Sequence, residues 1–88
     1  MSDWTWEYVP DAAYVVGGLT PRQIDEVERL ATRIADAVAV RRIGTPFGVD
    51  ESVSKVKSYG EGPVMIWFLE DYREDVVLVV RVNHFGAD

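Results

Sequence analysis

Two lysines, two positions apart, are the residues of this sequence best suited to binding phosphate. Lys55 and Lys57 lie in segment 53–59, which alternates apolar and polar residues as a β-strand does. A strand would direct both ammonium groups to one face, about 7 Å apart. There they could hold a phosphate or stabilise the charge that develops in phosphoryl transfer. The alternative is a solvated strand face, on which lysines discourage edge pairing.

His84 is the only histidine, so any imidazole acid or base must be this residue. It follows the Val-rich segment 76–82, where its side chain could lie at the rim of a sheet beside the lysines. Arg81 interrupts this segment and either extends to the strand edge or reaches a phosphate. For His84 the alternative is an exposed side chain without a chemical role.

The composition excludes several other kinds of site. The chain has 88 residues, no cysteine and one histidine, which argues against zinc, and we expect no metal and no cofactor. It contains no glycine-rich phosphate loop and no serine elbow. A formal charge of −6 disfavours nucleic-acid binding and makes a basic protein partner a reasonable counter-surface. We interpret the acidic cluster Glu70, Asp71, Glu74 and Asp75 as a solvated turn, with cation binding as the alternative.

A predicted hairpin near the C-terminal end organises the rest of the chain. Segments 63–69 and 76–82 are continuous apolar runs rich in Val, Ile and aromatic residues, separated by the acidic turn. At least one face of this hairpin must be covered. Segment 21–42 is the only long amphipathic helix available, with a Thr20–Gln23 capping box at its start and Asp25 spaced to pair with Arg29.

The remaining segments predict a small α+β domain. Residues 4–9 alternate as a half-buried strand, residues 11–16 form a short helix with Pro10 suited to its first turn, and residues 44–48 form a loop. The expected architecture is a single domain over residues 1–88 in the order β-α-α-β-β-β, with an antiparallel sheet of about four strands covered by two N-terminal helices. We see no secretory signal and no apolar stretch long enough to cross a membrane, and therefore expect a soluble cytoplasmic protein.

This order of elements resembles the RelE/ParE toxin superfamily. The resemblance covers roughly residues 6–85 and rests on Tyr-Val-Pro-Asp-Ala at 8–12, Ser-Lys-Val-Lys at 54–57, Gly-Pro-Val-Met-Ile-Trp at 62–67 and Asp-Val-Val-Leu-Val-Val-Arg-Val-Asn-His at 75–84. It implies a toxin encoded beside a cognate antitoxin that wraps around it. RelE-like members cut messenger RNA on the ribosome with basic side chains, whereas ParE-like members act on DNA gyrase.

The resemblance gives the candidate residues a shared role. Lys55 and Lys57 match the RelE-like lysine pair, and His84 matches a polar or basic position after the last strand. Together with Arg81 they form the candidate catalytic or RNA-contacting set of an endoribonuclease. The family's usual arginine at the third strand is replaced near Pro63, and Phe85 stands where a basic residue is common. A non-catalytic protein-binding module on the same fold, or a ParE-like gyrase inhibitor, is therefore the alternative.

Overall fold

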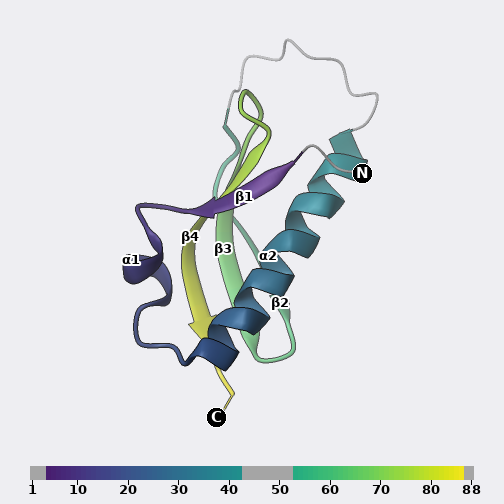
Figure 1. Ribbon diagram of the computed structural model, residues 1–88. Helices are drawn as coiled ribbons and strands as arrows, with labels where there is room; N and C mark the ends of the chain where they lie inside the picture. The colour runs from purple at the N-terminus through teal and green to yellow at the C-terminus, as the bar shows by residue number, and fades with distance from the viewer. Residues whose placement is uncertain (1–3, 43–52, 87–88) are drawn as a thin grey trace.

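The hairpin predicted near the C-terminal end forms the centre of the sheet. The computed structural model describes residues 4–42 and 53–86, and in it strands β3 (Val64–Asp71) and β4 (Val76–His84) pair antiparallel (Figure 1). The carboxylate of Asp71 accepts hydrogen bonds from the backbone amides of Arg73 and Glu74, which closes the turn between the strands. This confirms the hairpin on which the rest of the fold was predicted to depend.

Helix α2 (Pro21–Arg42) covers one face of this sheet and has the predicted bounds. Its capping box is formed: the Thr20 amide donates to the Gln23 side chain, and the Gln23 amide donates to the Thr20 hydroxyl. Figure 1 shows the helix crossing the sheet diagonally. Its buried stripe packs against the inner residues of β3 and β4, and consists of Val27, Leu30, Ala31, Ile34, Ala35 and Val38.

The first strand adds to the sheet in a direction that the sequence did not predict. Strand β1 (Thr5–Tyr8) lies beside β4, in the sheet order β1-β4-β3-β2, and runs parallel to it. The α+β class is confirmed, but the sheet is mixed rather than wholly antiparallel. A parallel neighbour requires a long connection, and here the two helices and the rest of the chain supply it.

Strand β2 begins later than expected. It spans Lys57–Glu61 rather than 53–59, and Val53 contributes only an isolated bridge to Asp71. Pairing with β3 sets these bounds, because the chain reverses immediately after β2 at Gly62, whose φ of 57° suits glycine. The predicted loop 44–48 lies outside the described residues.

Helix α1 (Ala12–Val16) is a minor part of the cover. Asp11 is its N-cap and accepts a hydrogen bond from the Tyr14 amide, so the helix begins after Pro10 rather than at it. Val16 is its one buried residue. The two predicted helices are both present, but α2 supplies most of the helical surface of the core.

The inner face of the sheet is set by strict alternation along β3. Val64, Ile66, Phe68 and Glu70 are buried, whereas the residues between them are partly exposed. Paired residues of neighbouring strands share a face, so the register determines which side chains of β2 and β4 point toward α2.

Candidate functional site

The two candidate lysines do not share a strand. Lys57 is the first residue of β2 and pairs with Phe68, so its side chain lies on the face that α2 covers. Its Nζ atom lies 3.3 Å from Oε2 of Glu70. Lys55 precedes β2 and is exposed. The structure therefore brings Lys57, but not a lysine pair on one strand face, against a buried carboxylate.

That carboxylate belongs to Glu70, which is fully buried. The interpretation of Glu70 as part of a solvated turn is wrong, because β3 extends to Asp71 and carries the Glu70 side chain inward. A signal was present in the sequence: Glu70 continues the two-residue alternation of Val64, Ile66 and Phe68.

Three neighbours hold Glu70 in place. Arg41 donates a hydrogen bond of 2.5 Å to Oε1, and the Tyr72 hydroxyl donates one of 2.8 Å to the same oxygen. The Glu70 amide donates to the Ser54 hydroxyl at 2.8 Å, which anchors the chain just before β2 to the same point. Within the described part of the chain, Oε2 is buried and accepts no hydrogen bond, and its ionic neighbour is Lys57.

These contacts set the charge state of Glu70. Burial by itself raises the pKa of this carboxyl group, because it disfavours the ionised form. The hydrogen bonds from Arg41 and Tyr72 and the positive charges of Arg41 and Lys57 act in the opposite direction and hold the pKa below its ordinary value of 4.5. Glu70 is therefore an anion at neutral pH, flanked by two cations.

His84 lies at the other end of the sheet. It pairs with Val64, four residues along β3 from Phe68, the partner of Lys57, which is about 13 Å of strand. Its side chain is 4% exposed, and Nε2 lies 3.3 Å from a carboxylate oxygen of Glu26 on α2. The Gly86 amide donates to Nδ1 at 3.2 Å, so a neutral imidazole carries its proton on Nε2 and donates it to Glu26.

Arg81 lies on the outer face. It pairs with Trp67, whose side chain alternates with that of the inward-facing Phe68, and its guanidinium carbon lies 5.1 Å from the centroid of the indole ring. The four predicted residues therefore occupy three places: Lys57 and the nearby Lys55 at one end of the sheet, His84 at the other, and Arg81 on the opposite face.

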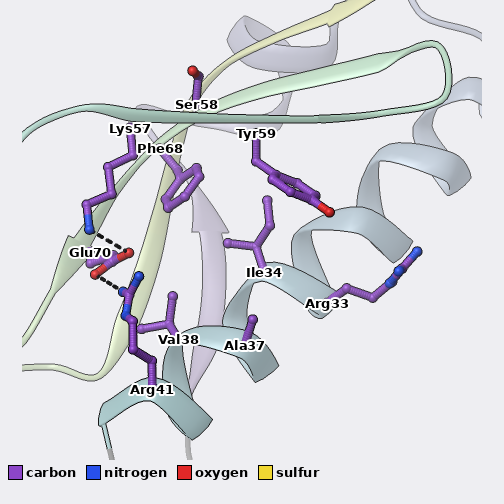
Figure 2. A pocket seen from close by; sticks show the side chains of 10 residues that line it. All are labelled: Arg33, Ile34, Ala37, Val38, Arg41, Lys57, Ser58, Tyr59, Phe68 and Glu70. Carbon is purple, nitrogen blue, oxygen red and sulfur yellow. Dashed lines mark hydrogen bonds and ion pairs between the residues drawn. The ribbon is translucent and has the colours of Figure 1, made fainter.

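The cavity beside Lys57 joins charged and apolar residues. It is a groove of about 460 Å³ between α2 and the inner side of β2. Figure 2 shows Lys57 and Arg41 converging on Glu70 at one end, Tyr59 extending over the space, and Ser58 pointing away from it. The apolar wall consists of Ile34, Ala37, Val38 and Phe68.

Ion pairs cross this groove at both ends. At the Glu70 end, Arg41 on α2 reaches the buried carboxylate on β3. At the other end Arg33, also on α2, pairs with Glu61, the last residue of β2. The arrangement can bind an apolar group between two charged ends. The sequence predicts only Lys57 as a site residue here, because the other residues come from elements that are distant in sequence.

Comparisons with known proteins add no relative to this description. No protein-family model matches the chain, and neither the curated proteins nor the solved structures contain a match. Within the described residues, neither helix has the length and hydropathy required to span a lipid bilayer. The same part of the chain contains no group of three histidine or acidic side chains arranged to hold a metal ion. The groove between α2 and β2, where Arg41, Lys57 and Glu70 lie beside an apolar wall, is the candidate functional site.

Proposed function

We propose that this protein is a protein-binding module of the RelE/ParE-like toxin–antitoxin class, and that it binds its partner in the groove between α2 and β2. The observation that carries the proposal is the groove itself, an apolar channel with a charged pair at each end. The order of elements, which resembles that of the toxin superfamily, supports a cognate antitoxin as the partner.

The shape of the groove favours a protein segment over a small molecule. Small-molecule pockets enclose most of their ligand, whereas here the residues along the rim are exposed, among them Arg33, Tyr59 and Arg41. The groove also runs beside β2, the last strand of the sheet order, which has a neighbour on one side only within the described sheet. Edge strands of this kind pair readily with another chain.

The test is co-purification with the product of the adjacent gene. Ala37→Arg places a long charged side chain into the groove from an exposed helical position, so we expect recovery of the complex to fall about tenfold or more. Val40→Arg is the matched control, because Val40 is exposed on the same helix, does not line the groove and gains the same charge. Circular dichroism checks that both variants fold.

Two results would contradict this proposal. Failure of the adjacent gene product to bind would remove the toxin–antitoxin assignment. A complex that survives Ala37→Arg as well as it survives Val40→Arg would place the binding surface elsewhere.

A messenger-RNA endoribonuclease is the second candidate. Cationic side chains at the Glu70 end of the groove favour it. Lys57 and Arg41, the latter on α2, both contact Glu70, and the exposed Lys55 lies two residues before Lys57. Expression would then arrest growth, and the double variant Lys55→Ala, Lys57→Ala would relieve the arrest. Arg81→Ala on the opposite face is the control. Unrelieved arrest would exclude this site, and a supercoiling assay would separate out a ParE-like gyrase inhibitor.

A further inference from the structure

Strand β2 forms one edge of the sheet. It is the last strand in the order β1-β4-β3-β2, and within the described residues β3 is its one neighbour. Residues 58–61 are all exposed, whereas β3 alternates buried and partly exposed residues. The backbone N–H and C=O groups along an exposed strand edge can pair with a strand of another chain. This edge is therefore a candidate interface.

The turn between β2 and β3 determines which backbone groups of β2 point outward. Glu61 and Val64 flank a two-residue turn, and residues that flank such a turn exchange hydrogen bonds with each other. Bonded pairs alternate along an antiparallel ladder, so the backbone groups of Tyr59 also point toward β3. Those of Ser58 and Gly60 point away from β3. A further strand would therefore pair with β2 through Ser58 and Gly60.

The charges of β2 make the strand complementary to a second copy of itself. Lys57 begins the strand, Glu61 ends it, and Tyr59 is its central residue. When two copies pair antiparallel with Tyr59 opposite Tyr59, each Lys57 lies opposite the Glu61 of the other copy. Ser58 then lies opposite Gly60, so the outward-directed groups of the two strands meet. The charges and the backbone hydrogen bonds thus favour the same register.

The other antiparallel registers that are centred on a residue of β2 oppose its charges less well. A pairing centred on Lys57 places two lysines opposite each other, and one centred on Glu61 places two glutamates there. Like charges directly opposite each other are destabilising. A pairing centred on Ser58 or Gly60 leaves one of the charged residues opposite Tyr59. The register centred on Tyr59 is therefore the one that matches each charge of β2 with its opposite.

The side chains at the centre of β2 are compatible with this contact. On the outer face, Ser58 has a small side chain and Gly60 has none. Figure 2 shows Tyr59 on the other face, toward α2, and its side chain is 48% exposed. Opposite aromatic side chains of two paired strands contact each other and stabilise the pairing. Pairing would therefore cover two tyrosine rings that are half exposed in the single chain.

The ion pairs within each chain do not prevent the contacts between copies. Nζ of Lys57 lies 3.3 Å from Oε2 of Glu70, and Glu61 pairs with Arg33. The side chains of Lys57 and Glu61 nevertheless remain 40% and 41% exposed. Each can approach the other copy from the solvent side while it keeps the partner in its own chain. Charges of alternating sign then cross the interface, from Arg33 and Glu61 of one copy to Lys57 and Glu70 of the other.

We propose that the free protein forms a two-fold symmetric dimer, in which the β2 strands of two copies pair antiparallel around Tyr59 and join the two sheets into one. Each copy contributes one short strand, so the dimer is weak, with a dissociation constant between about 10 µM and about 1 mM. In dilute solution this edge of β2 is therefore open to solvent. The dimer is a state of the free protein, so it goes beyond the proposed function and does not depend on it.

Sedimentation equilibrium of the full chain, from about 10 µM to about 2 mM, measures the association. Glu61→Lys places like charges opposite each other at both ends of the paired strands, so we expect the dimer to weaken about tenfold or more. Glu74→Lys is the matched control, because Glu74 is exposed in the β3–β4 turn and its replacement changes the net charge equally. Circular dichroism checks that both variants fold.

A cysteine at the centre of β2 tests the register. The natural chain contains no cysteine, so Tyr59→Cys supplies one thiol per copy. Opposite residues that exchange no hydrogen bonds have Cα atoms about 4.5 Å apart, within reach of a disulfide, and oxidised glutathione should crosslink the copies. Ser58→Cys is the control, because its two copies lie diagonally, about 7–8 Å apart, beyond that reach. We expect Tyr59→Cys to crosslink at least about tenfold faster.

Three results would overturn the proposal. The first is a monomer at every concentration up to about 2 mM. The second is a folded Glu61→Lys variant that associates as strongly as Glu74→Lys. The third is crosslinking of Ser58→Cys as fast as that of Tyr59→Cys, which also decides the matter if Glu61→Lys does not fold.

Discussion

At the scale of single residues, Glu70 shows how one inward-facing carboxylate can organise its neighbours. It connects α2 through Arg41, the β3–β4 turn through Tyr72, and β2 through Lys57. Moving a charge from water into the protein interior is unfavourable, so the stability of the fold depends on the partners of Glu70 remaining in place. Removal of a partner of Glu70 should therefore cost more stability than removal of Glu70 itself.

This inequality predicts different costs for the two ends of the Arg41–Glu70 pair. Arg41→Ala leaves the carboxylate buried with fewer donors, and we expect the free energy of unfolding to fall by about 2 kcal/mol. Glu70→Leu removes the buried charge and lets the partly exposed Arg41 turn to solvent, so we expect a change within about 1 kcal/mol. Urea unfolding at pH 7 measures both. A larger loss in Glu70→Leu would contradict this account.

Tyr8 supplies a prediction at the alkaline end. Its hydroxyl is buried, and burial together with the nearby Glu28 carboxylate raises the pKa of Tyr8 from 10.0 to about 12. As the pH rises, the unfolded chain loses the Tyr8 proton before the folded protein does. The contribution of Tyr8 to the free energy of unfolding is therefore fully present below pH 10 and is lost as the pH rises from 10 toward 12. The free energy of unfolding should therefore fall less over this interval in Tyr8→Phe than in the natural chain.

The measurement for Tyr8 is urea unfolding at several pH values between 9 and 12. Tyr14→Phe is the control, because Tyr14 is exposed and its side chain belongs to the short helix α1. Identical alkaline slopes for the natural chain and Tyr8→Phe would show that the phenol titrates as in the unfolded state.

At the scale of elements, the sequence predicts best where the signal is local. The bounds of α2 follow from its capping box and apolar spacing, and the hairpin follows from two β-branched runs with a turn between them. The parallel pairing of β1 with β4 could not be predicted, because the residue pattern of a strand does not indicate which other strand it pairs with or in which direction. The shift of β2 has the same origin, since pairing with β3 outweighs the alternation around Lys55.

The candidate site was predicted less well for the same reason. The charge of Lys57 marks it as a candidate in the sequence. The residues around it, Arg41 on α2 and Glu70 on β3, are distant in sequence and cannot be inferred from its neighbours in the chain. His84 was expected beside the lysines, and the register of β3 with β4 places it at the far end instead.

The start of α2 can be tested directly. Thr20→Ala removes the hydroxyl that accepts from the Gln23 amide, and we expect about 1 kcal/mol less stability toward unfolding. A double-mutant cycle with Gln23→Ala, followed by thermal unfolding, should show losses that are less than additive, because each side chain satisfies an amide of the other residue. Additive losses would mean that the two bonds act independently.

At the scale of the whole molecule, net charge is a poor guide to the binding surface. The formal charge of −6 suggests a basic partner, yet two cationic side chains, those of Arg41 and Lys57, lie against Glu70 at one end of the groove. The local arrangement of charged residues beside an apolar groove bears more directly on binding there than the net charge does.

The order of the sheet predicts a pattern of hydrogen exchange across the molecule. In the sheet formed by the described residues, β4 lies between β1 and β3, whereas β2 has a neighbour, β3, on one side only. We expect the outward-directed amides of β2 to exchange at least about tenfold faster than the slowest amides of β4. Exchange followed by NMR measures this. Equal protection of all β2 amides would show that another segment covers that edge.

The parallel pairing of β1 with β4 also bears on the order in which the fold is acquired. Synthesis delivers β1 before either helix, but the strand beside which it lies is the last of the four to be made. Until then the aromatic side chains of β1 have no sheet to join, and the pairing closes a loop of some seventy residues. Completion of the sheet is therefore a late event in the life of the nascent chain, and contacts between distant parts of the sequence set its pace.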